Sequence, residues 1–150
     1  MAMMRLDASG CMDRFGEYNK RGGDTRALVF KVDNPRDPHR IEVDAAVPKG
    51  DGGAAEDWPA VCACLPQDDC RYVLCGLSWE AEDGHTASKQ VFVLWSPSQA
   101  PIKTKLVYSA STGSLKQALQ GSWTNHQAGS EDGLEYETVL QRAKDSCTCA

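Results

Sequence analysis

Residues 89–121 read KQVFVLWSPSQAPIKTKLVYSASTGSLKQALQG and contain the most apolar run of the chain. That run, from Gln90 to Trp95, consists mainly of β-branched, aromatic and aliphatic side chains and is closed by Ser96 and Pro97. This composition predicts a β-strand. Because the run is apolar on both faces, we expect a central position in a sheet that helices cover on both sides.

From Pro101 onward the apolar spacing becomes helical. Proline is accepted in the first turn of a helix, where its missing N–H has no partner to lose. Gly113 interrupts the pattern, and Ser111 or Thr112 could cap a renewed turn, so we expect either one long kinked helix or two short helices in tandem. The residues at helical spacing are Ile102, Leu106, Ser109, Leu115 and Leu119.

The distribution of charge singles out the same segment. The chain has a net charge of −5, with 21 acidic and 16 basic residues, yet no acidic residue occurs from Gly84 to Ser130. Lys103 and Lys105 fall in the first turn of the expected helix, where the helix dipole disfavours each cation by about 0.3–1 kcal/mol. An acidic protein with one basic face is suited to a specific acidic partner.

Length and composition limit the class of protein. At 150 residues the chain is expected to form one domain that buries about 70% of its unfolded surface. No run approaches a membrane span, and the N-terminus lacks the apolar core of a signal peptide, so we expect a cytoplasmic protein. The seven cysteines form no paired C-x₂₋₄-C knuckles, which predicts free thiols and no metal site.

No pattern predicts catalysis or nucleic-acid binding. The three histidines share no motif with a nucleophile or a carboxylate, so we expect no catalytic residues. The glycine-rich residues 49–55 lack P-loop spacing and are interpreted as a linker, and no cofactor is predicted. A sequence pI of 5.1 without arginine clusters argues against a nucleic-acid partner.

The remaining residues complete a sheet with helices. We expect a first helix capped by Asp7 or Ser9, a short helix capped by Asp57, and a last helix over residues 133–144. The stripe expected to face inward in the first helix consists of Cys11, Met12, Phe15 and Tyr18. Further strands are predicted at residues 26–32, 40–43, 70–79 and 122–128, with residues 70–79 and 89–95 forming a hairpin across Glu80–His85. The pattern predicts a single α/β domain, a central mixed sheet of about five strands with helices on both faces.

The motifs of the central segment resemble the ADF/cofilin family of actin-binding proteins. They are V-F-V-L-W, then S-P-S-Q-A-P-I-K-T-K, then L-V-Y-S-A-S. The resemblance extends over nearly the whole chain and includes Leu65-Pro66, Asp69-Cys70-Arg71-Tyr72 and Arg142-Ala143-Lys144. It implies one domain over residues 1–150 with the ADF-homology fold, a flexible N-terminus at residues 1–6 and a flexible tail at residues 145–150.

The resemblance also implies a function. Family members bind actin monomers and filaments, favour ADP-bound subunits and promote depolymerisation and severing. The helix that begins at Ile102 would enter a hydrophobic cleft of actin, with Leu106 as an exposed anchor; the alternative for Leu106 is a place in the core. The implied actin-binding residues are Lys103, Lys105, Leu106, Ser109, Ser111, Met4 and Arg5.

A second surface is implied for filament binding, by basic residues on the central hairpin and near the last helix. Here it would comprise Lys89, Arg142 and Lys144, while the hairpin turn carries Glu80, Glu82 and Asp83. Because these acids reduce electrostatic docking, we expect weaker severing than is usual in the family.

The chain departs from the family pattern at two places. Met3 occupies the position of the family's regulatory serine, with Met4 where glycine is expected, and Gly76 stands where an aspartate is frequent.

Two alternatives to a depolymerising factor remain open. One is a coactosin-like protein that binds the filament side without depolymerising it, and the other is an interaction module that has lost actin as its partner. The partners expected from the resemblance are actin and, through the basic face, phosphoinositides, for a monomeric protein associated with the cytoskeleton.

Overall fold

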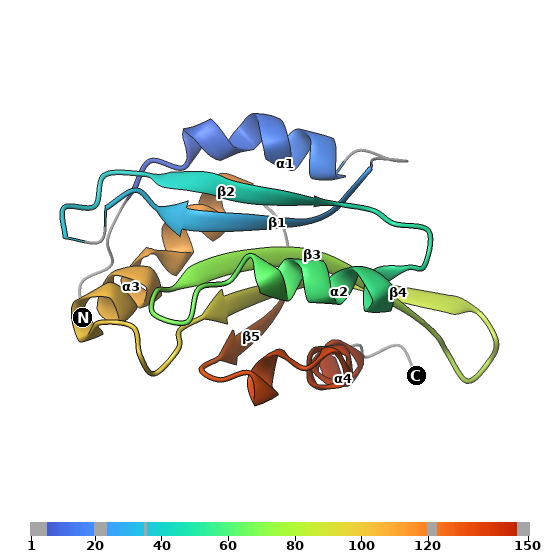
Figure 1. Cartoon of the computed structure of the whole chain (residues 1–150). Coiled ribbons are helices and arrows are strands. Elements are labelled where there is room, and N and C mark those ends of the chain that lie inside the picture. Colours follow the sequence, from blue (N-terminus) through green and yellow to red (C-terminus); the bar gives the residue numbers. More distant parts are fainter. Residues whose placement is uncertain (1–5, 20–23, 35, 120–122, 147–150) are drawn as a thin grey trace.

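The computed structural model describes residues 6–19, 24–34, 36–119 and 123–146. One sheet of five strands, in the order β2-β1-β3-β4-β5, forms its centre (Figure 1). The first four strands in this order pair antiparallel, and β5 runs parallel to β4. The sheet is therefore mixed, as the sequence predicted.

The strands form where β-branched and aromatic residues concentrate. Strands β3 and β4 make the predicted hairpin, with Arg71 opposite Trp95 and Glu80 opposite Thr86. The strand predicted at residues 90–95 is real but starts earlier, and β2 continues past the predicted end at Val43. The strands are β1 (Thr25–Val32), β2 (Ile41–Pro48), β3 (Arg71–Glu80), β4 (Thr86–Trp95) and β5 (Thr124–Ala128).

Helices cover both faces of the sheet. They are α1 (Met12–Asn19), α2 (Ala54–Ala63), α3 (Ile102–Leu119) and α4 (Tyr136–Ser146), with short 3₁₀ turns at Ser9–Cys11 and Asp132–Leu134. None of the helices among the described residues is long and apolar enough to cross a membrane.

Alternation along the strands divides the core into two layers. Leu28, Phe30 and Phe92 point to the face that α1 and α3 cover. Val29 and Val93 point to the opposite face, which α2 and α4 cover. Strands β1, β3 and β4 are therefore apolar on both sides, which explains the uninterrupted apolar run at residues 91–95.

Several predicted helix details are wrong. Helix α2 begins at Ala54, inside the predicted linker, so Asp57 lies in its first turn instead of capping it. Asp57 accepts hydrogen bonds from the Gly50 N–H and from Arg26 Nε, and these bonds lower the pKa of its carboxyl group. Met12, expected inside, is 40% exposed.

The chain ends also differ from expectation. The predicted last helix is divided, because Glu135 has extended backbone (ψ 136°) between the 3₁₀ turn and α4. Asp145 and Ser146, expected in a flexible tail, belong to α4. At the other end, the Leu6 N–H donates to Ser114 Oγ (3.1 Å).

Tyr108 fixes α3 to the sheet. Its side chain is fully buried, and its hydroxyl oxygen accepts a hydrogen bond from the Val32 N–H at 3.0 Å. Its own backbone carbonyl accepts a hydrogen bond from the hydroxyl of Tyr72 on β3 at 2.5 Å. One residue thus connects α3 to two neighbouring strands, and this sets which side of the helix faces outward.

We expect Tyr108→Phe to lower the free energy of unfolding by about 1–3 kcal/mol, because it leaves the buried Val32 N–H without its acceptor. Urea denaturation measures this. Tyr136→Phe is the control: its ring packs against Trp58 at 6.1 Å between centroids, and its hydroxyl has no hydrogen bond among the described residues. Its effect should stay within about 0.5 kcal/mol. Equal losses in both variants would contradict the role given to Tyr108.

Candidate functional site: the exposed side of helix α3

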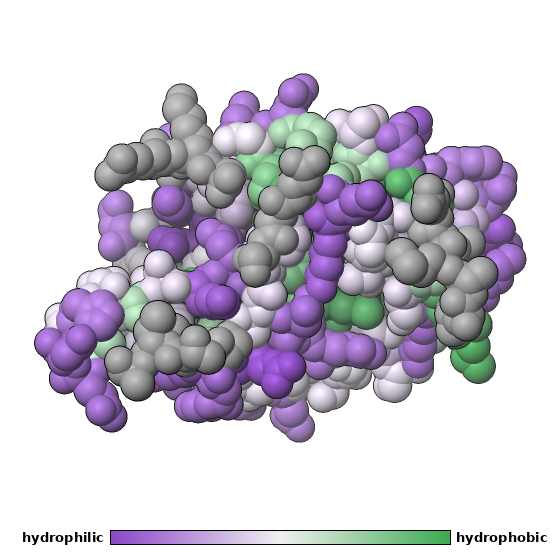
Figure 2. Space-filling model, turned by 180° about the vertical axis from the view of Figure 1, so that it is seen from behind, coloured by the Kyte–Doolittle hydropathy of each residue, from purple (hydrophilic) through white to green (hydrophobic). Residues whose placement is uncertain are grey.

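The outer side of α3 carries apolar side chains that the core does not use. Ile102 is 76% exposed and Leu106 is 47% exposed, and Ser109 continues the same side one turn later. Spacings of four and three residues place the three on one stripe of a helix. In Figure 2, hydrophobic surface projects at the right-hand edge, the end of the molecule at which α3 begins in Figure 1. Two large hydrophobic side chains one turn apart make a short apolar ridge.

The inner side of α3 explains why this ridge stays outside. Val107 and Tyr108 are buried and occupy the space above the sheet, so the adjacent Leu106 is directed away from it. The alternative that Leu106 belongs to the core is therefore wrong. The residues of α3 that are buried are Thr104, Val107, Tyr108, Ser111, Leu115 and Leu119.

Ser111 does not belong to the candidate surface. Its side chain is 0% exposed, so it cannot contact a partner while α3 is packed on the sheet. The predicted stripe combined two sides of the helix, because Ile102, Leu106 and Ser109 face outward whereas Leu115 and Leu119 face the core. Helix α3 also runs unbroken through Gly113, so the tandem alternative is wrong.

Lys103 and Lys105 add positive charge beside the apolar ridge. Lys103 is exposed and its Nζ donates to the Arg36 carbonyl at 3.4 Å, while Lys105 Nζ donates to the Ser98 carbonyl at 3.2 Å. Among the described residues no carboxylate lies within ion-pair distance of either ammonium group. The start of α3 therefore combines uncompensated positive charge with exposed apolar surface.

The lysines of the acid-free segment do not form one face. Lys116, near the end of α3, contacts the sheet: its ammonium group donates to Asn125 Oδ1 and its Nζ stands 5.1 Å from the centre of the Phe92 ring. Burial lowers the pKa of Lys116. Lys89 belongs to the β4 arm of the hairpin. Only Lys103 and Lys105 accompany the ridge on α3.

The residues predicted for filament binding lie apart from α3's first turns. Arg142 and Lys144 are exposed on α4, and Arg142 Nε donates to the Asn125 carbonyl at 3.0 Å. Lys144 lines a hollow of about 540 Å³ together with the acidic hairpin turn, Glu80 to His85. In that turn Asp83 pairs with His85. The positive charge of Lys144 is thus placed beside acids of the hairpin.

Some predicted positions fall outside the described residues, and one exposed residue was missed. Met4 and Arg5, and the regulatory position Met3, belong to residues 1–5, which the structure does not describe. Ile102 was not included among the binding residues, although it is the most exposed large hydrophobic side chain among the described residues. Its spacing of four residues from Leu106, directly after a proline, was the available signal.

The first turns of α3, from Ile102 to Ser109, contain no His, Cys, Asp or Glu. Among the described residues no group of three or more His, Cys, Asp and Glu side chains could hold a metal ion. Burial raises the pKa of Cys11 to about 11 and that of Cys75 to about 12, so these thiols are protonated at neutral pH. The α3 surface can bind a partner that presents an apolar cleft with carboxylates at its edge.

The sequence matches a family model described as cofilin/tropomyosin-type actin-binding protein over residues 3–144. Cofilin from Schizosaccharomyces pombe is 33% identical to the chain over 132 residues, which cover 88% of the chain and 89% of that protein.

Solved structures agree with the fold. Cofilin from Streptomyces griseoflavus superposes with a TM-score of 0.79 at 25% identity, covering 95% of this chain and 98% of that one. Coactosin from Entamoeba histolytica superposes with a TM-score of 0.73 at 22% identity, covering 93% and 94%. The likeness to coactosin concerns the fold alone.

We expect Leu106→Ala to change the free energy of unfolding by less than about 1 kcal/mol, because Leu106 is half exposed and leaves no cavity. The same change at Leu115, which is fully buried on the same helix, should cost about 2–5 kcal/mol. Urea denaturation of both variants compares identical chemistry on opposite sides of α3. A loss at Leu106 as large as that at Leu115 would place Leu106 in the core.

Proposed function

The chain belongs to the family of cofilin/tropomyosin-type actin-binding proteins, and from this membership and the surface of α3 we propose that it binds actin monomers and filaments and promotes filament depolymerisation. The observation that carries the proposal is the ridge of Ile102 and Leu106 beside Lys103 and Lys105. The packing of α3 turns Ile102 and Leu106 outward, and the core makes no use of their exposed apolar surface. A protein partner of complementary shape and charge gives them a use.

The proposed contact assigns a role to each side chain. Ile102 and Leu106 enter an apolar cleft of actin. Full burial of an exposed side chain of this size contributes about 1.5–3 kcal/mol, and the gain is smaller for Leu106, which is already half buried. Lys103 and Lys105 meet carboxylates at the edge of that cleft and fix the orientation of the helix. Ser109 extends the contact by one turn, and Met4 and Arg5 join it from the segment before α1. The dipole cost of two lysines in the first turn is offset when actin's carboxylates approach.

The mechanism is differential binding, without covalent chemistry. If the protein binds ADP-bound subunits and an altered filament twist more tightly than other states, each bound molecule shifts the filament toward those states. The shift cannot exceed the difference in affinity between the states. Filament loss follows because the favoured geometry weakens contacts between subunits.

The filament surface on the hairpin and α4 is proposed to be weak. Lys89, Arg142 and Lys144 supply its positive charge, and Glu80, Glu82 and Asp83 in the adjoining turn oppose it. We therefore expect severing to be feebler than in a relative with a basic hairpin. The protein acts mainly through the surface of α3 that binds actin monomers. It acts in the cytoplasm, with the actin cytoskeleton.

A coactosin-like activity is the alternative, in which the protein binds filament sides and does not depolymerise them. The fold does not separate the two, since coactosin superposes well on the chain. The exposed Ile102 and Leu106 favour the depolymerising function, because side binding alone gives them no use. Phosphoinositides that reach Lys103 and Lys105 would compete with actin for the same charges.

We expect the double variant Lys103→Ala/Lys105→Ala to lose depolymerising activity, with monomer affinity reduced by about 1–3 kcal/mol per lysine that meets a desolvated carboxylate. Co-sedimentation measures the actin left in the supernatant across a titration of the protein. Lys89→Ala/Lys144→Ala is the matched control, because it removes the same charge from the filament surface and should leave monomer binding intact.

The outcomes separate the candidate functions. Wild-type protein that raises soluble actin while the α3 variant does not supports the proposal. Protein that pellets with undiminished filaments supports the coactosin-like alternative. Protein that stays unbound, with all actin in the pellet, means that actin is not its partner.

We expect Glu82→Lys/Asp83→Lys to increase severing, because the double change converts an acidic hairpin turn into a basic one. Severing counted by microscopy of single filaments should rise most at low salt, where surface charges are screened least. Ala81→Lys adds charge without removing acid and should give a smaller gain. Wild-type severing already equal to that of a basic-hairpin relative at the same salt would contradict the weak filament surface.

A further inference from the structure

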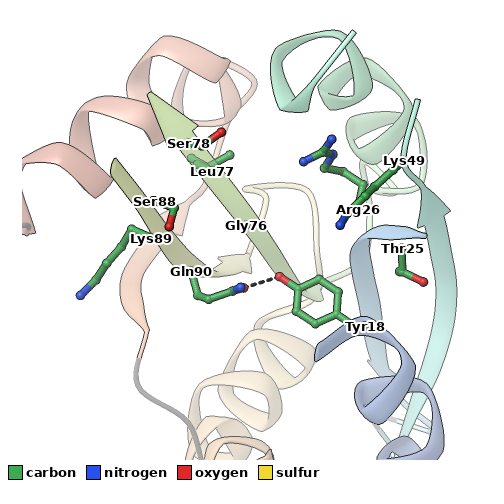
Figure 3. A pocket seen from close by; sticks show the side chains of 10 residues that line it. All are labelled: Tyr18, Thr25, Arg26, Lys49, Gly76, Leu77, Ser78, Ser88, Lys89 and Gln90. Carbon is green, nitrogen blue, oxygen red and sulfur yellow. Dashed lines mark hydrogen bonds between the residues drawn. The ribbon is translucent and has the colours of Figure 1, made fainter. Parts of the chain in front are cut away.

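A separate cavity lies where strands β1 and β3 part. The two strands pair only over Ala27–Phe30 and Tyr72–Cys75. Beyond these pairs they diverge, and a cavity of about 360 Å³ opens between them (Figure 3). Tyr18 of α1 borders the cavity on one side and Lys49, just after β2, on the other. The cavity is thus formed by the sheet and its flanks, away from the exposed ridge of α3.

The lining of this cavity is rich in hydrogen-bond donors and free of acid. None of its ten residues is Asp or Glu, although the whole chain has a net charge of −5. Three of the ten are basic, and most of the rest carry hydroxyl or amide groups. The polar lining residues are Tyr18, Thr25, Arg26, Lys49, Ser78, Ser88, Lys89 and Gln90. Such a lining favours an anion over a cation or an apolar ligand.

Lys49 supplies a positive charge to the cavity that no carboxylate of the described residues neutralises. Its side chain reaches toward the cavity beside Arg26 in Figure 3, whereas Lys89 points away. Among the described residues no carboxylate lies within ion-pair distance of Lys49. Arg26 Nε is bound to Asp57 at 2.8 Å, so Arg26 offers N–H groups whose charge is already balanced. An anion would therefore be attracted mainly by Lys49.

Tyr18 and Gln90 line the bottom of the cavity with uncharged groups, and a hydrogen bond between them fixes their orientation. The Tyr18 hydroxyl donates to Gln90 Oε1, which leaves the amide nitrogen of Gln90 as a donor. Burial raises the pKa of Tyr18, so its phenol remains neutral and does not repel an anion. A Cβ atom added at Gly76 would lie 3.4 Å from Gln90 Nε2 and 3.7 Å from Tyr18 Oη. These are ordinary van der Waals distances, so position 76 lies directly beside the Gln90 donor and the Tyr18 hydroxyl.

We propose that the cavity between β1 and β3 binds a phosphate group, present as inorganic phosphate or as the phosphomonoester of a larger molecule. A phosphate offers several acceptor oxygens, and here an ammonium group, an amide N–H and hydroxyls surround one space. A carboxylate has fewer oxygens and would leave some of these donors unused. This proposal does not depend on the proposed action on actin.

The test is a titration of the protein with inorganic phosphate at constant ionic strength, in which isothermal calorimetry or ³¹P NMR measures binding. Chloride is the control anion. We expect Gly76→Asp to abolish binding, because it puts a carboxylate inside the cavity. Gly76→Ala should retain binding within about twofold, since its Cβ makes ordinary contacts. Comparing the two variants separates the effect of added negative charge at position 76 from the effect of added side-chain volume.

Lysine variants test whether removing a positive charge from the cavity weakens phosphate binding. Lys49→Gln should weaken phosphate binding about tenfold, the change expected when one hydrogen bond to a charged group is lost. Lys144→Gln removes the same charge from α4 and should leave binding unchanged. Lys49 is exposed and lies just outside a strand, so its variant remains informative if Gly76→Asp fails to fold. Thermal melts establish which variants are folded.

The source of the phosphate is distinguished by the probe. Inorganic phosphate and a soluble inositol phosphate test a free phosphomonoester, and phosphatidylcholine vesicles containing phosphatidylinositol bisphosphate test a lipid headgroup. Binding of any of these that is lost in Gly76→Asp and weakened in Lys49→Gln supports the site and identifies its source. Absence of binding with every probe, or binding that neither variant changes, would overturn the proposal.

Discussion

Tyr108 connects helix α3 to the sheet through two hydrogen bonds, and the rest of the proposed binding surface depends on this connection. Its hydroxyl satisfies the Val32 N–H, and its carbonyl satisfies the hydroxyl of Tyr72. A rotation of α3 about its axis would break both bonds. It is disfavoured because each buried polar group left without a partner costs free energy. This fixed rotation turns Ile102 and Leu106 outward and keeps Ser111 inside.

Electrostatics distinguishes the two surfaces. At the start of α3 two lysines stand in a position that the helix dipole disfavours, and among the described residues no carboxylate pairs with them. On the hairpin and α4 the bases lie beside acids, as Lys144 does beside the turn from Glu80 to His85. The carboxylates of a partner would therefore be attracted more strongly to the start of α3 than to the hairpin and α4. The charge distribution therefore favours the proposed contact at α3 over the proposed filament surface.

The sequence predicted what depends on local pattern. The apolar run before Trp95, the hairpin and the long helix from Ile102 were predictable because strand and helix periods are visible in a single chain. The sides of α3 were not, because Leu106 and Val107 are adjacent and only the packing of Tyr108 decides which one is buried. Ser111 was misplaced for the same reason, and the early start of α2 was hidden by glycines. The cavity beside Gly76 had no signal, since it arises where β1 and β3 diverge.

Hydrogen–deuterium exchange of the protein, alone and with ADP-bound monomeric actin, shows whether the start of α3 is the surface that actin covers. The first N–H groups of a helix have no acceptor within it, and here the Lys105 N–H bonds the Pro101 carbonyl at 3.0 Å. The amides just before Lys105 should therefore exchange quickly in the free protein. We expect slower exchange over residues 102–109 when actin binds, with exchange over residues 80–86 of the hairpin unchanged. Protection of the hairpin with unchanged exchange in α3 would contradict it.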